Sequence, residues 1–327
     1  MSMEFAGKIA VVTGGGAGMG RELVRQLAAA GAHVATCDIS ADNLAETARL
    51  VTTESPGVTI STFVADVSSE EQLTSFRDHV MTSHGVDHIH LLFNNAGIGG
   101  GGSFVLDDRA EWEQVFNICW GGVYLGCRTF LPLLQAAPEG HIVNTSSVNG
   151  FWATLGGRAH TAYSAAKFAV KGFSEALITD LALYAPHLKV SVVMPGHIGT
   201  DIAFNSGAYF GRSPKELSDE HVAQMRQRFG AEGLDMSAAS DEDLRNAVVT
   251  MATAFRDNAP VTAAQAATVI LDGVRDGRWR ILVGDDAHAL DRAVRADPES
   301  AYQADFLANL QSTGVFNNLA VDDSPGV

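Results

Sequence analysis

Residues 8–20 read Lys8-Ile-Ala-Val-Val-Thr-Gly-Gly-Gly-Ala-Gly-Met-Gly20, a short apolar run that leads directly into a glycine-rich loop. The β-branched run is typical of a buried parallel strand, and residues 21–30 carry apolar side chains at helical spacing. A strand, a glycine loop and a helix in this order place backbone N–H groups and a helix N-terminus against a phosphate. Met19 breaks a G-x-G-x-x-G match, but Thr13 to Gly20 reads T-G-x-x-x-G-x-G. A glycine turn without a ligand is the alternative; the flanking strand and helix favour phosphate binding.

The next apolar run, His33-Val-Ala-Thr-Cys-Asp38, predicts a second strand that ends in a carboxylate. A carboxylate at this place can accept hydrogen bonds from both hydroxyls of an adenosine ribose, and it repels a 2′-phosphate. Neither Ile39 nor Ser40 adds a positive charge. We therefore expect NAD rather than NADP, the alternative being an acidic strand end that caps the following helix.

Strand and helix patterns then alternate along the chain. Further strands are expected at 58–64, 89–93, 140–145, 188–193 and 279–283, and helices at 41–54, 68–84, 109–134, 163–184 and 262–274. This alternation predicts an α/β fold with a doubly wound, mostly parallel, seven-stranded Rossmann-like sheet and helices on both faces. Ligands of such sheets bind at the carboxyl ends of the strands, where the chemically distinctive stretches of this chain also fall.

Tyr163-Ser-Ala-Ala-Lys167 is one of these stretches. On a helix, residues four apart lie on the same face, so the phenol and the ammonium are expected to be neighbours. A cation about 4 Å away would lower the tyrosine pKa from roughly 10 by about three units at an effective dielectric near 20. Tyr163 would then serve as an acid and base near neutral pH. A surface helix with an ordinary Tyr and Lys is the alternative for this motif taken alone.

Composition excludes several classes of function. The chain has 327 residues, 46% of them hydrophobic, and a formal charge of −16, which fits a globular protein. Basic residues do not cluster, so no nucleic-acid partner is expected. Its three cysteines form no C-x-x-C pair, which indicates a reducing compartment without disulfides or a zinc site, and the scattered histidines predict no metal. Without a signal pattern or an apolar run of 18 residues, we expect a cytoplasmic protein with no membrane span.

With these residues in place, the chain resembles the short-chain dehydrogenase/reductase family over about residues 5–200 and again over 262–284. The resemblance implies cofactor contacts from the glycine loop, the ends of the second and third strands, the Asn-Asn-Ala-Gly turn and the turn after the sixth strand. These contacts are Gly14, Gly16, Ala17, Gly18, Met19, Gly20, Asp38, Ile39, Asp66, Val67, Asn94, Ala96, Gly97, Pro195, Gly196, Ile198 and Thr200. It also implies a catalytic set of Ser147, Tyr163 and Lys167, of which Tyr163 and Lys167 also contact the cofactor, with Ser146 as second choice for the serine.

Two departures from the family pattern stand out. Cys119 occupies the position on the long helix where the family usually has an active-site Asn, whose carbonyl helps to hold a water of the proton relay. A cysteine keeps the carbonyl and loses the amide. The interval from Ser147 to Tyr163 is longer than is usual, which suggests a wider loop beside the substrate.

The resemblance makes residues 1–284 a single dinucleotide-binding and catalytic domain, with a substrate lid at about 201–258 and a C-terminal extension at 285–327. Apolar lid residues suit a hydrophobic substrate, or they only pack the lid onto the body. These residues are Phe204, Tyr209, Phe210, Met225, Phe229 and Met251. The extension covers a neighbouring subunit or the site entrance, or is a packing arm.

The function expected from this resemblance is hydride transfer between NAD and a secondary alcohol or ketone, with Tyr163 as the acid and base. An epimerase or dehydratase on the same fold is one alternative, and a non-catalytic dinucleotide-binding regulatory protein is another. The expected partners are a small-molecule substrate and further copies of the chain, in a homodimer or homotetramer.

Overall fold

The protein was analysed as a computed structural model that describes residues 3–100, 102–154, 159–231, 235–236 and 238–312. Within those residues, one parallel sheet of seven strands has the order β3-β2-β1-β4-β5-β6-β9. The strands are β1 (Ile9–Thr13), β2 (His33–Asp38), β3 (Ile60–Val64), β4 (Leu91–Asn94), β5 (Gly140–Thr145), β6 (Leu188–Pro195) and β9 (Arg280–Val283). The prediction of a doubly wound seven-stranded sheet is confirmed. Strand order reverses between β1 and β4, which opens a crevice at their carboxyl ends.

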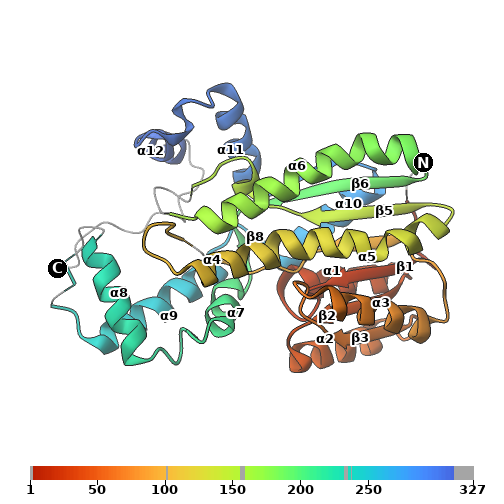
Figure 1. The fold of residues 1–327 in the computed structure, drawn as a ribbon, viewed down its shortest axis with the longest axis horizontal. Coiled ribbons are helices and arrows are strands. Elements are labelled where there is room, and N and C mark those ends of the chain that lie inside the picture. Colours follow the sequence, from red (N-terminus) through yellow and green to blue (C-terminus); the bar gives the residue numbers. More distant parts are fainter. Residues whose placement is uncertain (1–2, 101, 155–158, 232–234, 237, 313–327) are drawn as a thin grey trace.

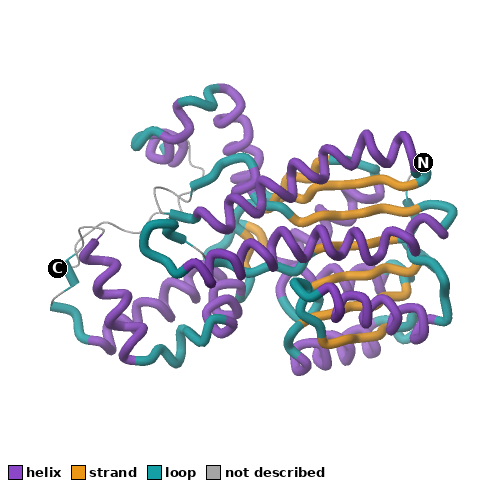
Figure 2. Tube along the Cα trace, viewed as in Figure 1, coloured by secondary structure: helices purple, strands orange, loops and turns teal. Residues whose placement is uncertain are grey.

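Helices cover both faces of the sheet, because each strand is apolar on both sides. One face carries α1 (Gly18–Ala29), α2 (Ala41–Glu54) and α10 (Ala263–Arg275). The other carries α3 (Glu70–His84), α4 (Arg109–Phe116), α5 (Gly122–Ala136) and α6 (Thr161–Tyr184). Figures 1 and 2 show α5 and α6 running along this second face of the sheet. Two separate apolar cores lie on the two sides.

Local sequence explains where several helices begin and end. The side chain of Ser69 accepts a hydrogen bond from the Gln72 N–H at the start of α3, and Gly85 ends that helix with φ +62°. Ser40 caps α2 in the same way. α1 begins at Gly18, three residues before the predicted start, so Gly18 and Gly20 of the glycine loop belong to its first turn.

The segment after β6 contains β7 (Ile198–Gly199), α7 (Ile202–Tyr209), α8 (Asp219–Ala231), α9 (Asp241–Asp257) and β8 (Val261–Thr262), and β7 pairs with β8. α8 and α9 pack against each other around Leu217, Val222 and Leu244 and project from the sheet (Figure 1). Met225 and Phe229 belong to this small core, so they pack the two helices together.

The chain ends in α11 (Asp285–Ala296), a 3₁₀ turn (Ser300–Tyr302) and α12 (Phe306–Gln311). This C-terminal segment packs on the loop after β5, where the Trp152 indole N–H donates to the Ala301 carbonyl at 2.8 Å. Residues 313–327 of the predicted extension lie outside the described part. The division into a catalytic domain, a lid and an extension remains a prediction.

Candidate functional site

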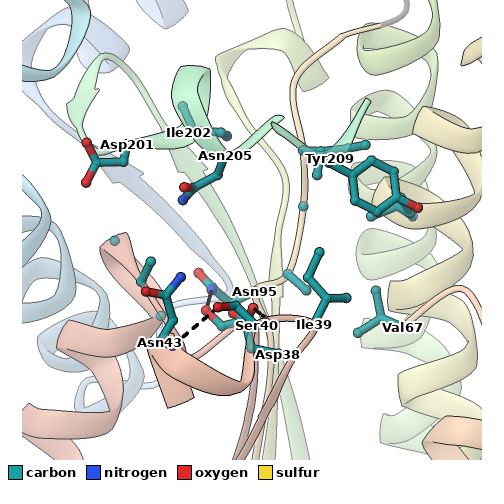
Figure 3. A pocket seen from close by; sticks show the side chains of 18 of the residues that line it. Asp38, Ile39, Ser40, Asn43, Val67, Asn95, Asp201, Ile202, Asn205 and Tyr209 are labelled. Atoms are coloured by element: carbon teal, nitrogen blue, oxygen red, sulfur yellow. Dashed lines mark hydrogen bonds between the residues drawn. The ribbon is translucent and has the colours of Figure 1, made fainter. Parts of the chain in front are cut away.

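A cavity of about 470 Å³ lies at the carboxyl ends of β1, β2 and β4. Twelve predicted cofactor contacts line it: Gly14, Ala17, Gly18, Met19, Gly20, Asp38, Ile39, Asp66, Val67, Ala96, Gly97 and Thr200. Figure 3 shows Asp38, Ile39 and Ser40 on one side of the gap, with Asn205 and Tyr209 of α7 across from them. The sequence did not indicate that α7 would form this second wall.

The glycine loop fits a phosphate because it is narrow and has free backbone donors. A side chain at Gly14 would place its Cβ 2.7 Å from the Ala96 Cα, and one at Gly20 would place it 1.9 Å from the Gly14 carbonyl oxygen. Glycine at both positions lets the loop close tightly. No side chain caps the start of α1, where Ala17 is the N-cap, so the first N–H groups of the helix are available to an anion.

Asp38 is fixed at the rim of the cavity by two backbone donors. Its Oδ2 accepts from the Gly16 N–H and its Oδ1 from the Ser40 N–H, both at 3.0 Å. Each carboxylate oxygen keeps a further lone pair that can accept from a ribose hydroxyl. Because Ser40 caps α2, the alternative in which Asp38 caps that helix is wrong.

The Asn-Asn-Ala-Gly turn is held to the glycine loop through Thr13. The Thr13 Oγ1 accepts from the Asn95 N–H at 3.0 Å and from the Ala96 N–H at 3.1 Å. Asn94 requires a correction, because its buried side chain points away from the cavity and donates to the Asn144 Oδ1 at 2.9 Å. Its neighbour Asn95 lines the cavity instead.

Four other predicted contacts do not line the cavity: Gly16, Pro195, Gly196 and Ile198. Gly16 lies behind the loop, where its N–H is bonded to Asp38. Ile198 is buried in the core beneath α10, and Pro195 ends β6. Of the contacts predicted in the turn after β6, Thr200 at its end is therefore the one that lines the cavity.

The predicted catalytic residues lie together beside this cavity. The Lys167 Nζ is 5.3 Å from the centre of the Tyr163 ring and donates to the Thr145 carbonyl at 2.9 Å. The Ser147 side chain lies close enough to Tyr163 to lower the pKa of the phenol. Ser146 is excluded as the second choice, because its hydroxyl donates to the Lys167 carbonyl at 2.7 Å within the core.

The pKa of Tyr163 shifts in the opposite direction to the predicted one. Burial raises the pKa of Tyr163 above its usual value, and the nearby Ser147 side chain offsets this only in part. Burial also lowers the pKa of Lys167, which is 2% exposed and points its Nζ at the Thr145 carbonyl. The predicted lowering of the Tyr163 pKa by an adjacent ammonium is therefore wrong for the protein's own groups, because removal from water outweighs the attraction.

Cys119 lies within a π-helical turn (Asn117–Gly121) that separates α4 from α5, a geometry often found at functional sites. Its buried thiol donates to the Ile98 carbonyl at 3.2 Å. A Cβ at Gly97 would lie 3.6 Å from the Lys167 Nζ and 3.7 Å from the Cys119 Sγ. Gly97 thus lies between the wall of the cavity and the catalytic cluster.

His160 is a neighbour of Tyr163 that the sequence analysis missed. The centres of the two rings are 4.7 Å apart, and burial lowers the pKa of His160 to about 4. Its position three residues before Tyr163 on the same turn was the available signal. The neighbouring loop is shaped by Asn149, which donates to the Trp152 and Thr154 carbonyls; residues 155–158 of the predicted wide loop lie outside the described part.

No metal or membrane feature accompanies this site. The part of the chain that the structure describes contains no group of three His, Cys, Asp or Glu side chains arranged to hold a metal ion. In the same residues, no helix has both the length and the apolar character of a membrane span.

Comparison with known proteins identifies relatives of this arrangement. A family model described as short chain dehydrogenase matches residues 8–208. SadH of Mycobacterium tuberculosis, named as an oxidoreductase, is 33% identical over 292 residues, 89% of this chain and 91% of SadH. Levodione reductase of Leifsonia aquatica is 31% identical over 67% of this chain and 80% of its own. A short-chain dehydrogenase/reductase of Burkholderia phymatum, solved in complex with NAD, superposes with a TM-score of 0.72 at 27% identity, covering 91% of this chain and 96% of its own.

Proposed function

The chain belongs to the short-chain dehydrogenase/reductase family of oxidoreductases, and from this premise we propose that it is an NAD-dependent alcohol dehydrogenase or ketone reductase. Its substrate is a small hydrophobic secondary alcohol or ketone, and Tyr163 is its acid and base. The observation that carries the proposal is the continuity at Gly97: this residue lines the cavity on one side and faces the Lys167 Nζ on the other. A dinucleotide in the cavity would therefore have its reactive end within reach of the Tyr163 cluster.

Asp38 supports NAD over NADP. Its carboxylate lies at the rim of the cavity and would repel a 2′-phosphate, while Ile39 and Ser40 beside it are neutral. Arg21 is nearby, but its guanidinium donates to the Gly16 and Asn43 carbonyls behind the loop. The Burkholderia relative was solved with NAD and other relatives with NADP or NADPH, so the proposed choice rests on Asp38.

A nicotinamide cofactor held by the residues that line the cavity would supply the hydride chemistry. The protein's part is to position the substrate oxygen and to handle its proton. The Ser147 side chain lies near Tyr163, so a substrate oxygen placed between the two hydroxyls would be held beside the phenol. Tyr163 takes the hydroxyl proton in oxidation and donates it in reduction. Lys167, fixed by the Thr145 carbonyl, lies next to the ring and would hold the nicotinamide end of the cofactor.

A ketone substrate is supported by similarity to levodione reductase, whose name assigns it a ketone. We propose that the protein is cytoplasmic and works as a homo-oligomer. An epimerase or dehydratase of this fold would return its cofactor unchanged, and a regulatory protein would not turn over at all. Net formation of reduced nicotinamide, followed by absorbance, separates the proposed function from both alternatives.

The decisive test combines a panel of hydrophobic secondary alcohols, assayed with NAD and separately with NADP, with the variant Tyr163→Phe. We expect turnover with NAD that exceeds turnover with NADP, because Asp38 repels the extra phosphate. Tyr163→Phe should reduce kcat by about 10²–10⁴-fold, since the proton loses its acceptor, while NADH binding stays within about twofold of wild type.

Ser146→Ala is a matched control, because Ser146 donates to a helix carbonyl and does not face the phenol. It should retain far more turnover than Ser147→Ala. Near-normal turnover by Tyr163→Phe would refute the role of the phenol, and faster turnover with NADP would refute the choice of cofactor.

A further inference from the structure

Asp286 is a buried carboxylate that the proposed chemistry does not use. It lies in the first turn of α11, outside the sheet, and is 5% exposed. Among the described residues it forms no ion pair with a lysine or arginine. A buried, unpaired carboxylate is costly unless backbone donors satisfy it, so its position calls for an explanation.

Its donors come from the turn that follows β6. The Asp286 Oδ2 accepts from the His197 N–H at 2.6 Å, and its Oδ1 accepts from the Ala287 N–H at 2.8 Å. Two glycines make room for the group. A Cβ at Gly196 or at Gly284 would lie 2.3 Å from the carboxylate oxygens. The carboxylate is therefore in direct contact with the backbone of the turn at residues 195–197.

The same turn is held from its other side by α9. The His197 Nε2 donates to the Phe255 carbonyl at 2.6 Å, and the two rings lie in contact, tilted by 38° with their centres 4.3 Å apart. The short turn is thus held between α11 on one side and α9 on the other.

The turn also runs from the strand beside the serine pair to the glycine loop. It leaves β6 next to the serine pair, since the Ser146 N–H donates to the Val193 carbonyl at 2.8 Å. It ends at Thr200, whose Cγ2 would be 3.3 Å from a Cβ built on Gly18 of the glycine loop. The turn therefore connects the strand beside Ser146 with the rim of the glycine loop.

We propose that Asp286 is a positioning residue whose carboxylate holds the turn at residues 195–197 in the shape that receives the nicotinamide half of the cofactor. The inference rests on the proposed function, because it takes the cavity to be a dinucleotide site. This role gives the C-terminal segment, which contains none of the dinucleotide-binding motifs, a part in cofactor binding.

The variant Asp286→Asn tests this directly. An amide keeps the volume of the carboxylate but offers one acceptor and one NH₂, so one of the two backbone N–H groups faces a donor. Asp285→Asn is the matched control, because Asp285 is the preceding residue, carries the same charge and is exposed. Two probes are titrated at equilibrium: NADH, and ADP-ribose, which lacks the nicotinamide ring.

We expect Asp286→Asn to weaken NADH binding by about fivefold to tenfold, the effect of losing one buried hydrogen bond. ADP-ribose binding should stay within about twofold of wild type, and Asp285→Asn should leave both unchanged. Gly196→Ala places a methyl group against the Asp286 carboxylate from the side of the turn, so it should also weaken binding of NADH and not of ADP-ribose. This variant replaces Asp286→Asn if the latter does not fold.

Equal weakening of NADH and ADP-ribose would assign Asp286 a general structural role and overturn the inference. Unchanged NADH binding in both folded variants would overturn it as well. If the wild-type protein binds neither probe, the proposed function itself fails, and this inference fails with it.

Discussion

Tyr163 shows how far the environment of a residue can depart from what its spacing suggests. Four-residue spacing to Lys167 places the two side chains on one face of α6, as expected, with the ammonium 5.3 Å from the ring centre and bonded to the Thr145 carbonyl. Because burial raises the pKa of Tyr163, the phenol is protonated at neutral pH. Its resting form is thus the proton donor needed for reduction.

Alcohol oxidation and ketone reduction should therefore depend differently on pH. Oxidation needs the phenolate, whose population grows as pH rises toward a raised pKa, so kcat/KM for an alcohol should increase steadily between about pH 6 and pH 9. Ketone reduction uses the protonated phenol and should stay level over the same range. Steady-state rates at saturating cofactor measure both.

His160 provides the control for this profile. Its pKa is lowered to about 4 by burial, so it stays neutral above about pH 5 and contributes no slope. His160→Gln should therefore keep the slope of the oxidation profile whatever its effect on the rate. An oxidation profile that is flat in the wild-type protein would contradict a raised tyrosine pKa.

Patterns within an element were predictable from sequence, whereas contacts between distant elements were not. Apolar runs indicated the strands, and Ser69 before two glutamates indicated the start of α3, because these signals are local. Asn94 and Asn95 are adjacent and chemically identical, so only the register of β4 decides which one faces the cavity. The contact of Asp286 with the turn after β6 joins residues 89 positions apart and has no local signal.

α7 is the clearest example of an element that sequence placed only approximately. The segment was expected to be a substrate lid, but the structure brings α7 over the cavity at the glycine loop. Two hydrogen bonds hold it there: the Gly99 N–H donates to the Ser206 Oγ at 2.8 Å, and the Gln114 side chain donates to the Tyr209 hydroxyl at 2.7 Å. We infer that α7 retains the cofactor as well as facing the substrate.

Tyr209→Ala tests that inference. The variant removes the aromatic wall opposite Ile39 and the link to Gln114, so NADH should dissociate about tenfold faster in a stopped-flow displacement experiment. Tyr209→Phe keeps the ring and loses only a partly exposed hydrogen bond, so it should change the rate by less than about threefold. Equal dissociation rates for Tyr209→Ala and wild type would show that α7 does not hold the cofactor.

At the scale of the whole molecule, exposed apolar side chains lie on two neighbouring helices of this acidic protein. Tyr124 on α5 and Phe168 and Ile178 on α6 are 42%, 41% and 39% exposed, and we call these residues the α5–α6 face. The two helices are joined by ring contacts of Phe173 with Trp120 and with Tyr124. Apolar side chains gathered on adjoining helices are typical of protein interfaces. We propose that a second copy of the chain covers the α5–α6 face in the homo-oligomer.

The double variant Tyr124→Asp, Ile178→Asp should therefore convert the oligomer into monomers, because four like charges would meet across a two-fold interface that is otherwise apolar. Light scattering coupled to size-exclusion chromatography measures the mass. Phe104→Asp is the control: Phe104 is also apolar and 75% exposed, but it lies on the loop before α4, so its variant should keep the wild-type mass. Since Tyr163 and Lys167 lie on α6 as well, separation of the subunits should also lower turnover. A monomeric wild-type protein, or an unchanged mass in the double variant, would place the interface elsewhere or remove it.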